Sequence, residues 1–280
     1  MAAAALIFLR EGVEGSMIVA ILLAYLSRIG RRDLFRDIFT GVALALVLAG
    51  SVGVVVYLTV HTYSGTRGQT LFETATYLLA TAVLTYMTLW MHSHARTMAR
   101  DLKQRVDAAV AVDRRARFGL GLLAFQAVGR EGLETVVFTL AIAFSASAVA
   151  VLAGGSLGLL GALVISYFVY RLGHRINIGV FFQVLGTLLM VFAAGLLVDA
   201  VENLQQIGWL PVLTRSVWNT GSVLSEQGAL GDILHTFFGY ASAPSQLQVI
   251  VYVLYVASVL FLFFGVGARL RSRHAPSPPR

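Results

Sequence analysis

Two stretches, Arg10-Glu11-Gly12-Val13-Glu14 and Arg130-Glu131-Gly132-Leu133-Glu134, repeat one pattern of three charges inside strongly apolar sequence. A charged side chain at the centre of a membrane helix costs roughly 2.5–3.5 kcal/mol on insertion scales. A chain that carries such a pattern twice is expected to use the charges. The duplication also predicts an internal repeat whose two copies meet at one place.

Composition assigns the chain to the membrane proteins. Of its 280 residues 58% are hydrophobic and 12% are charged, whereas soluble domains carry about 25% charged residues. A polytopic membrane protein is therefore predicted. The absence of cysteine excludes disulfides and thiolate metal sites, so any bound metal must use ligands such as carboxylates, carbonyls or imidazoles.

Hydropathy predicts seven membrane-spanning helices, each of about 20 residues or more. An all-α membrane protein is thus the expected fold class. The predicted spans are Ala4–Leu26, Ile38–Val60, Leu71–Met91, Phe118–Phe144, Val149–Tyr170, Ile178–Val198 and Leu247–Val266.

The distribution of basic residues predicts the orientation of these spans. Seventeen of the 21 lysines and arginines lie in the first, third and fifth loops and in the C-terminal tail, and only Arg67 and Arg215 lie on the opposite side. Since cytoplasmic loops are the basic ones, the N-terminus is expected outside and the C-terminus inside. This orientation accounts for the net charge of +7, so no nucleic-acid partner is predicted.

The predicted orientation indicates that the duplicated motif belongs to an inverted repeat. The first span runs inward and the fourth outward, yet both carry the motif, so spans one to three and four to six are predicted to form a 3+3 inverted repeat with the seventh span extra. The predicted divisions are residues 1–95 and 118–202 for the two repeats, 96–117 for a linker, and 203–280 for an outer segment and the last span.

Each connection outside the repeats contains one predicted helix. In the linker, Leu102 and Val106 belong to an apolar face that indicates an amphipathic cytoplasmic helix touching anionic lipid. In the outer segment, apolar residues at helical spacing predict a short helix packed on the protein surface: Leu230, Ile233, Leu234, Phe237 and Phe238.

Within each motif the helical geometry places both glutamates on one face. Gly12 and Gly132 lack side chains, so another helix or the twin motif can approach closely. Two motifs together carry four carboxylates and two guanidinium groups, a formal charge of −2. Oxygen ligands in a confined negative site favour a hard cation such as Fe³⁺, Mn²⁺, Mg²⁺ or Ca²⁺.

A structural alternative stays open for the motifs. Arg10–Glu14 and Arg130–Glu134 can be internal salt bridges that lock two helices together, which leaves Glu11 and Glu131 without a role.

A weaker acidic group is the candidate entrance for a cation. Glu73, Asp199 and Glu202 all fall at predicted outer ends of spans, where carboxylates raise the local cation concentration.

The doubled Arg-Glu-Gly-x-Glu motif in a seven-span protein resembles the oxidase-dependent iron transporters, the fungal high-affinity iron permeases and the bacterial ferrous-iron-uptake permeases. The resemblance covers essentially the whole chain. It implies inward iron transport, with Glu11, Glu14, Glu131 and Glu134 as metal ligands and with Arg10, Arg130, Gly12 and Gly132 in support. Asp199-Ala200-Val201-Glu202 loosely resembles an acidic cluster that the family carries after its sixth span.

The same resemblance implies a setting and a partner. It implies a multi-pass protein of a bacterial inner membrane, with an extracytoplasmic iron oxidase or peroxidase and a cupredoxin-like protein as partners and with membrane lipids around it. No cofactor is expected, because iron is the transported substrate. The alternatives are a transporter of another divalent metal, lead or manganese, and an intramembrane enzyme. No nucleophile pair or HExxH-type helix supports the enzyme alternative, so the chain is predicted not to be an enzyme.

Overall fold

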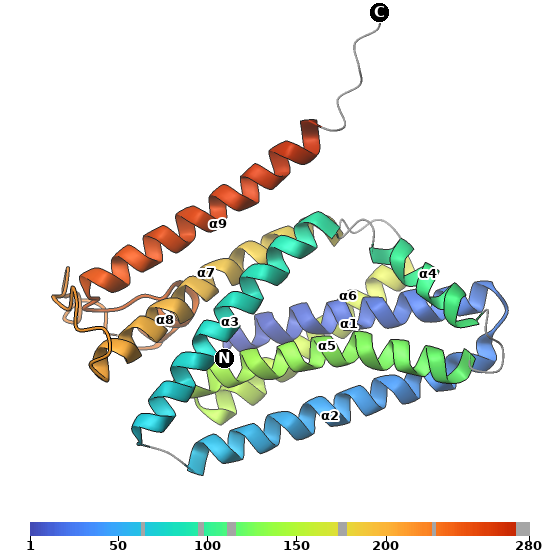
Figure 1. Cartoon of the computed structure of the whole chain (residues 1–280), viewed down its shortest axis with the longest axis horizontal. Coiled ribbons are helices and arrows are strands. Elements are labelled where there is room, and N and C mark those ends of the chain that lie inside the picture. The colour runs from blue at the N-terminus through green and yellow to red at the C-terminus, as the bar shows by residue number, and fades with distance from the viewer. Residues whose placement is uncertain (63–64, 95–97, 111–115, 173–177, 226–227, 273–280) are drawn as a thin grey trace, which may run out of the picture. The chain divides into compact units, whose positions relative to one another are not determined.

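The computed structural model describes residues 1–62, 65–94, 98–110, 116–172, 178–225 and 228–272. This part of the chain is helical and contains no β-strand beyond one isolated bridge. Figure 1 shows the elements in chain order, and their bounds are α1 Ala2–Arg28, η1 Arg32–Leu34, α2 Phe35–Thr62, α3 Arg67–His94, α4 Met98–Val110, α5 Ala116–Ser145, α6 Ala148–Leu172, α7 Ile178–Gln206, α8 Ala229–Phe238 and α9 Gln246–Ser272.

Each of the seven predicted spans lies within one long helix, namely α1, α2, α3, α5, α6, α7 and α9. Among the described residues, four stretches are long and apolar enough to cross a membrane: Arg32–Thr59, Arg67–Met91, Ala148–Phe168 and Val180–Gln206. They confirm an all-helical chain with several membrane spans. Helices α1 and α5 are not among the four, and each carries the three charges of its motif. The count of seven spans and their orientation stay predictions.

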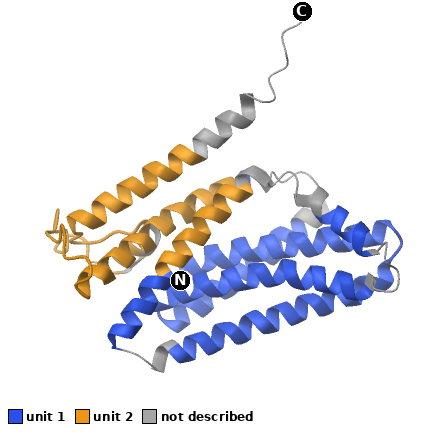
Figure 2. Ribbon diagram, viewed as in Figure 1, with its two compact units in different colours: residues 1–76, 96–181 blue, residues 77–95, 182–280 orange. Residues whose placement is uncertain are grey.

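The chain divides into two compact units, drawn in different colours in Figure 2. Unit 1 contains Met1–Thr76 and Arg96–Phe181, and unit 2 contains Tyr77–Ala95 and Phe182–Arg280. These units group helices by packing rather than by sequence similarity. They leave the predicted division into two repeats untested.

In unit 1 the helices pair across the predicted repeats, with α1 packed along α6 and α2 packed along α5. Gly12 of α1 faces Ala162 of α6, and Gly132 of α5 faces Ala49 of α2; a Cβ on either glycine would lie 2.8 Å from the alanine Cβ. The motif glycines therefore admit α6 and α2, respectively, and each pair of backbones approaches closely. In residue number, the two glycines differ by 120 (132 against 12) and the two alanines by 113 (162 against 49).

A second pair of contacts lies one helical turn further on, and its residue numbers differ by the same 120 and 113. Ser16 of α1 is hydrogen-bonded to Ser166 of α6, and the corresponding positions, Val136 of α5 and Gly53 of α2, also face each other. In both pairs the contact advances by four residues on each helix, so α1 is parallel to α6 and α2 is parallel to α5. Figure 1 shows α1 and α5 running in opposite directions, as an inverted repeat requires.

Within unit 1, the linker helix α4 packs against α1 and α5. Leu102 and Val106 are buried in a hydrophobic cluster with residues of α1, α2 and α5, and the Tyr25 hydroxyl donates a hydrogen bond of 2.5 Å to Asp107. The predicted amphipathic helix exists. These two apolar side chains pack against protein, and the contact of the helix with anionic lipid stays a prediction.

In unit 2, α7 packs closely against both α3 and α8. The Thr81 hydroxyl donates to the Ala193 carbonyl oxygen at 3.2 Å, and Gly195 of α7 lies against Gly239, the left-handed residue that ends α8. The short helix in the outer segment is confirmed, but three residues of its predicted packing face, Leu230, Ile233 and Phe238, are exposed. The predicted packing face is wrong for these residues, and α8 contacts α7 through Gly239, which follows its last residue. Phe237 lies outside the described side chains.

The glycine contacts give a prediction with a matched control. Gly12→Ala adds a methyl group 2.8 Å from the Cβ of Ala162, whereas Gly15→Ala, on the same helix, adds one with no atom within 4 Å. We expect Gly12→Ala to lose about 1–3 kcal/mol of stability through overpacking, and Gly15→Ala to lose none. Thermal unfolding of the two purified variants measures the difference. Equal melting temperatures would contradict the close approach of α1 to α6.

Candidate metal site

The α1 motif forms a fully buried ion network. Nη1 of Arg10 donates to Oε1 of Glu11 at 2.7 Å, and Nε of Arg10 lies 3.1 Å from Oε1 of Glu14. All three side chains are at most 3% exposed. One planar guanidinium group therefore orients both carboxylates of its motif.

The α5 motif repeats these contacts in a more open setting. Nη2 of Arg130 donates to Oε1 of Glu131 at 2.8 Å, and its Nε lies 3.4 Å from Oε1 of Glu134. The carboxylates are buried or nearly so, but the Arg130 side chain is 46% exposed, against 3% for Arg10. The two halves of the site are thus equivalent in contacts and unequal in access.

This geometry corrects one part of the salt-bridge alternative. That alternative paired each arginine with the second glutamate of its motif and left Glu11 and Glu131 unpaired. In the structure each arginine contacts both glutamates, and its shortest contact is to the first.

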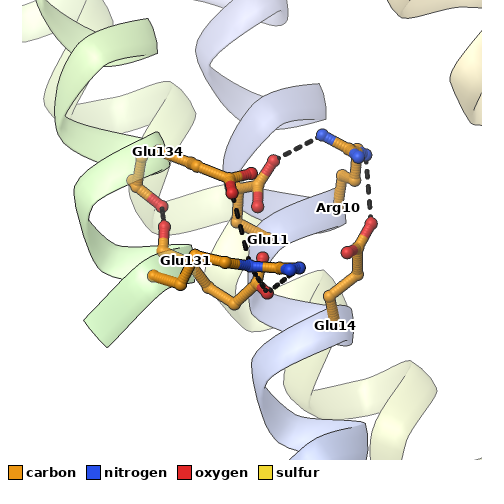
Figure 3. A network of polar contacts seen from close by, with 7 residues as sticks. Arg10, Glu11, Glu14, Glu131 and Glu134 are labelled. Atoms are coloured by element: carbon orange, nitrogen blue, oxygen red, sulfur yellow. Dashed lines mark hydrogen bonds and ion pairs between the residues drawn. The ribbon is translucent and has the colours of Figure 1, made fainter. Parts of the chain in front are cut away.

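The two motifs meet between α1 and α5 (Figure 3). Glu11, Glu14 and Glu131 each offer one carboxylate oxygen, and these three oxygens lie within 4.8 Å of one another. Oxygens on opposite sides of one ion are about 4.0–4.2 Å apart for Mg²⁺ and about 4.6–5.2 Å apart for Ca²⁺, twice the metal–oxygen distance. The expected meeting of the motifs is therefore observed, at a spacing that a single ion can bridge.

The network leaves carboxylate oxygens unused. Within the described part of the chain, the second oxygens of Glu11, Glu14, Glu131 and Glu134 are buried and accept no hydrogen bond. A buried acceptor without a partner costs about 1–3 kcal/mol, and more when it is charged. Four carboxylates against two guanidinium groups leave a formal −2 in a confined space. A cation that accepts these oxygens as ligands removes both costs.

The candidate entrance residues are held by neighbouring amides. Glu73, in unit 1, accepts a hydrogen bond from Nε2 of Gln69 at 2.8 Å. Glu202, in unit 2, accepts one from Gln206 at 3.0 Å and another from Gln248 at 3.1 Å. Because Glu73 and Glu202 belong to different units, their common role at an entrance stays a prediction.

One residue close to Asp199 was not predicted from the sequence. His235 of α8 places Nε2 at 4.0 Å from Oδ1 of Asp199. No local signal connects two residues that lie so far apart in the chain, and the contact follows from the docking of α8 on α7.

Glu73 provides a test of the entrance role. Glu73→Gln is expected to raise the apparent KM for the transported ion several-fold, with a smaller change in maximal rate. A carboxylate at an entrance raises the local concentration of the ion but does not hold it at the site formed by the two motifs. The effect should shrink at high ionic strength, where charges near water are screened. Uptake measured against ion concentration at two salt concentrations checks this. An unchanged KM with a lost maximal rate would instead assign Glu73 to the site formed by the two motifs.

The family model that matches the chain is the iron permease FTR1 family, over residues 1–275. The chain belongs to this family. It is 32% identical over 258 residues to the ferrous iron permease EfeU of Escherichia coli O6:H1, covering 92% of this chain and 93% of that protein. It is 31% identical over 259 residues to the ferrous iron permease EfeU of Yersinia pestis, covering 92% of both. No solved structure matches the chain significantly.

Membership of this family confirms several expectations. The relatives are permeases rather than enzymes, and the family transports iron. Together with the apolar helices, this makes the chain a multi-pass membrane protein of iron transport. The family names no site residues, so the role of the two motifs rests on the geometry above.

Proposed function

We propose that this permease moves iron inward across a bacterial inner membrane through a site formed by Glu11, Glu14, Glu131 and Glu134. The observation that carries the proposal is the convergence of three carboxylate oxygens within 4.8 Å from two helices that run in opposite directions. The unused buried oxygen on each of the four glutamates supports it. An iron ion would exchange part of its water shell for these oxygens.

The arginines prepare the carboxylates for the ion. A guanidinium group has no acceptor atom and cannot ligate a cation, so Arg10 and Arg130 act by orienting the carboxylates and keeping them ionised. Each holds one oxygen of a glutamate and leaves the other oxygen available. The formal −2 left over matches a divalent ion.

The packing of unit 1 supports a mode of transport. The parallel pairs α1/α6 and α2/α5 are closely joined through glycine and small side chains, whereas the α1–α5 interface carries the carboxylates. Rocking of one pair against the other would open the site to each side of the membrane in turn, as described for inverted-repeat transporters.

The expected partners of this permease are proteins that oxidise iron outside the membrane. The resemblance to oxidase-dependent iron transporters supports an extracytoplasmic oxidase or peroxidase and a cupredoxin-like protein as partners of this chain. Iron is the substrate, and no resident cofactor is needed for its passage. The sequence contains no GxxxxGK[ST] motif, which argues against direct use of ATP.

Uptake into proteoliposomes tests the function directly. The purified protein is supplied in parallel with Fe²⁺, Fe³⁺, Mn²⁺ and Pb²⁺, and the Glu11→Gln/Glu131→Gln double variant serves as the control for leakage. We expect iron to accumulate with the parent protein and not with the double variant. Accumulation of Mn²⁺ or Pb²⁺ in preference to iron would identify a transporter of another divalent metal. Iron uptake that the double variant retains would remove the motifs from the pathway.

A further inference from the structure

We propose that the linker helix α4 is the inner gate of this permease. It closes the path from the carboxylate site toward the predicted cytoplasmic side, is held by a hydrogen bond between Tyr25 and Asp107, and lifts to let an ion leave. The passage of iron through this gate rests on the proposed function, whereas its closing and opening are properties of unit 1. The helices that form it, α1, α2, α4 and α5, all belong to that unit.

An apolar cluster lies beyond the carboxylate site on one side of the two motifs. Its buried residues on α1, Ile18, Leu22 and Leu26, follow the first motif, and those on α5, Leu120 and Ala124, precede the second. Because α1 and α5 run in opposite directions (Figure 1), both sets lie on the same side of the carboxylates. At 1.5 Å per residue, Leu22 and Leu120 lie roughly 12–17 Å along their helices from the nearest motif glutamates.

The cluster bars an ion from this side of the site. Leu22, Leu26 and Leu120 have no exposed surface, and every buried member of the cluster is apolar. An ion that entered this layer would lose its water shell and gain no ligand, and apolar constrictions close pores by excluding water. While the cluster stays packed, an ion does not leave along the α1–α5 interface in this direction.

Helix α4 completes the cluster and bridges the two helices that carry the motifs. Its Leu102 and Val106 are buried among the residues of α1 and α5. At the edge of the cluster, the exposed Tyr25 hydroxyl of α1 donates to Asp107 of α4 at 2.5 Å. Since α1 and α5 belong to different parallel pairs, a helix that contacts both holds the pairs together at this level.

The attachment of α4 is weaker than that of the other helices around the cluster. Within each parallel pair, glycines bring the backbones so close that an added Cβ would collide with the neighbouring helix, as at Gly12 and Gly132. Among the described side chains of α4, only Leu102 and Val106 are buried. Lifting α4 therefore exposes little apolar surface and leaves both pairs intact, which makes it the part of the seal that moves.

A disulfide between α4 and α5 tests whether α4 must lift. The chain has no cysteine, so an engineered pair forms the only disulfide. A Cβ on Gly119 of α5 would lie 3.4 Å from the Cβ of Ala109 in α4, near the spacing of about 3.5–4.5 Å found in disulfides. In proteoliposomes, oxidation of Ala109→Cys/Gly119→Cys should reduce iron uptake by at least about tenfold, because a locked gate stops each cycle.

Reduction of the same sample supplies the control for folding. Uptake should return when a reductant opens the disulfide, and the two single cysteine variants should not respond to oxidation. A static α4 that merely supports the fold predicts the opposite result. Equal uptake by the oxidised and reduced double variant, with the disulfide verified by gel mobility, overturns the gate.

A second measurement follows the opening without iron. Leu22→Cys places a thiol inside the buried cluster, where a charged methanethiosulfonate reagent reaches it only when α4 lifts. Adding Tyr25→Phe removes the hydroxyl that donates to Asp107 and should speed the labelling about two- to tenfold, the equilibrium effect of one hydrogen bond. Tyr86→Phe makes the same change at an exposed position in unit 2 and serves as the matched control.

The labelling result separates the gate from the proposed function. Labelling that is no faster with Tyr25→Phe than with Tyr86→Phe overturns the gate, whatever the protein transports. Failure of iron uptake by the parent protein would refute the proposed function and leave the labelling result intact.

Discussion

Glu11→Gln and Glu131→Gln are each expected to reduce iron uptake by more than about 100-fold, beyond the upper end of losses caused by outer-shell changes at metal sites. Each substitution keeps the size of the side chain and removes its charge and one strong ligand. Both carboxylates belong to the oxygen cluster that spans 4.8 Å. Uptake of ⁵⁵Fe into proteoliposomes, normalised to the amount of inserted protein, measures the loss.

A matched carboxylate-to-amide change controls for the chemistry of the substitution. Asp33 lies in the short connection between α1 and α2, where its half-exposed side chain pairs with Arg31. Asp33→Asn should therefore leave uptake unchanged. If Gln at all four motif glutamates, tested singly, preserved uptake, the motifs would be salt bridges that lock α1 to α5.

Arg10→Ala and Arg130→Ala are expected to differ sharply, although each arginine is the first residue of the same five-residue motif. Arg10 is enclosed with both its glutamates, so its removal leaves buried carboxylates without a partner and costs roughly 3–5 kcal/mol. Arg130 is 46% exposed, so water can replace it near Glu131. We expect Arg10→Ala to fail to fold and Arg130→Ala to fold with impaired uptake.

The yield of monodisperse protein in detergent, followed by thermal unfolding, checks this difference. The lysine variants supply the control for charge, because lysine keeps the positive charge and loses the planar fork that contacts two carboxylates. Arg10→Lys should restore folding more than it restores uptake. Equal yields of the two alanine variants would show that the unequal burial of the two arginines does not affect the stability of the folded protein.

The sequence by itself determined the class of the molecule and the residues of its candidate metal site. Apolar runs of about 20 residues predict helices whatever their neighbours, because a spanning segment must satisfy its backbone hydrogen bonds internally. Burying charged side chains in such a segment costs free energy, so both Arg-Glu-Gly-x-Glu motifs are predicted to be functional. The spacing of the glutamates places two carboxylates on one face of each helix. The meeting of Glu11 and Glu14 with Glu131 followed from the duplication, and the structure contains it.

Only the tertiary structure decided how the helices pair and which groups meet through that pairing. Gly12 can pack closely against either the second motif or α6, and the choice depends on which of them has a small residue at the contact. In the structure that residue is Ala162 of α6, 150 residues away in the chain. The burial of Arg10 against the exposure of Arg130 has no counterpart in two nearly identical pentapeptides, since access is set by the surrounding helices. The contact between His235 and Asp199 likewise depends on the docking of α8 at Gly195. Periodicity reports one helix at a time, whereas these features are properties of the surfaces between helices.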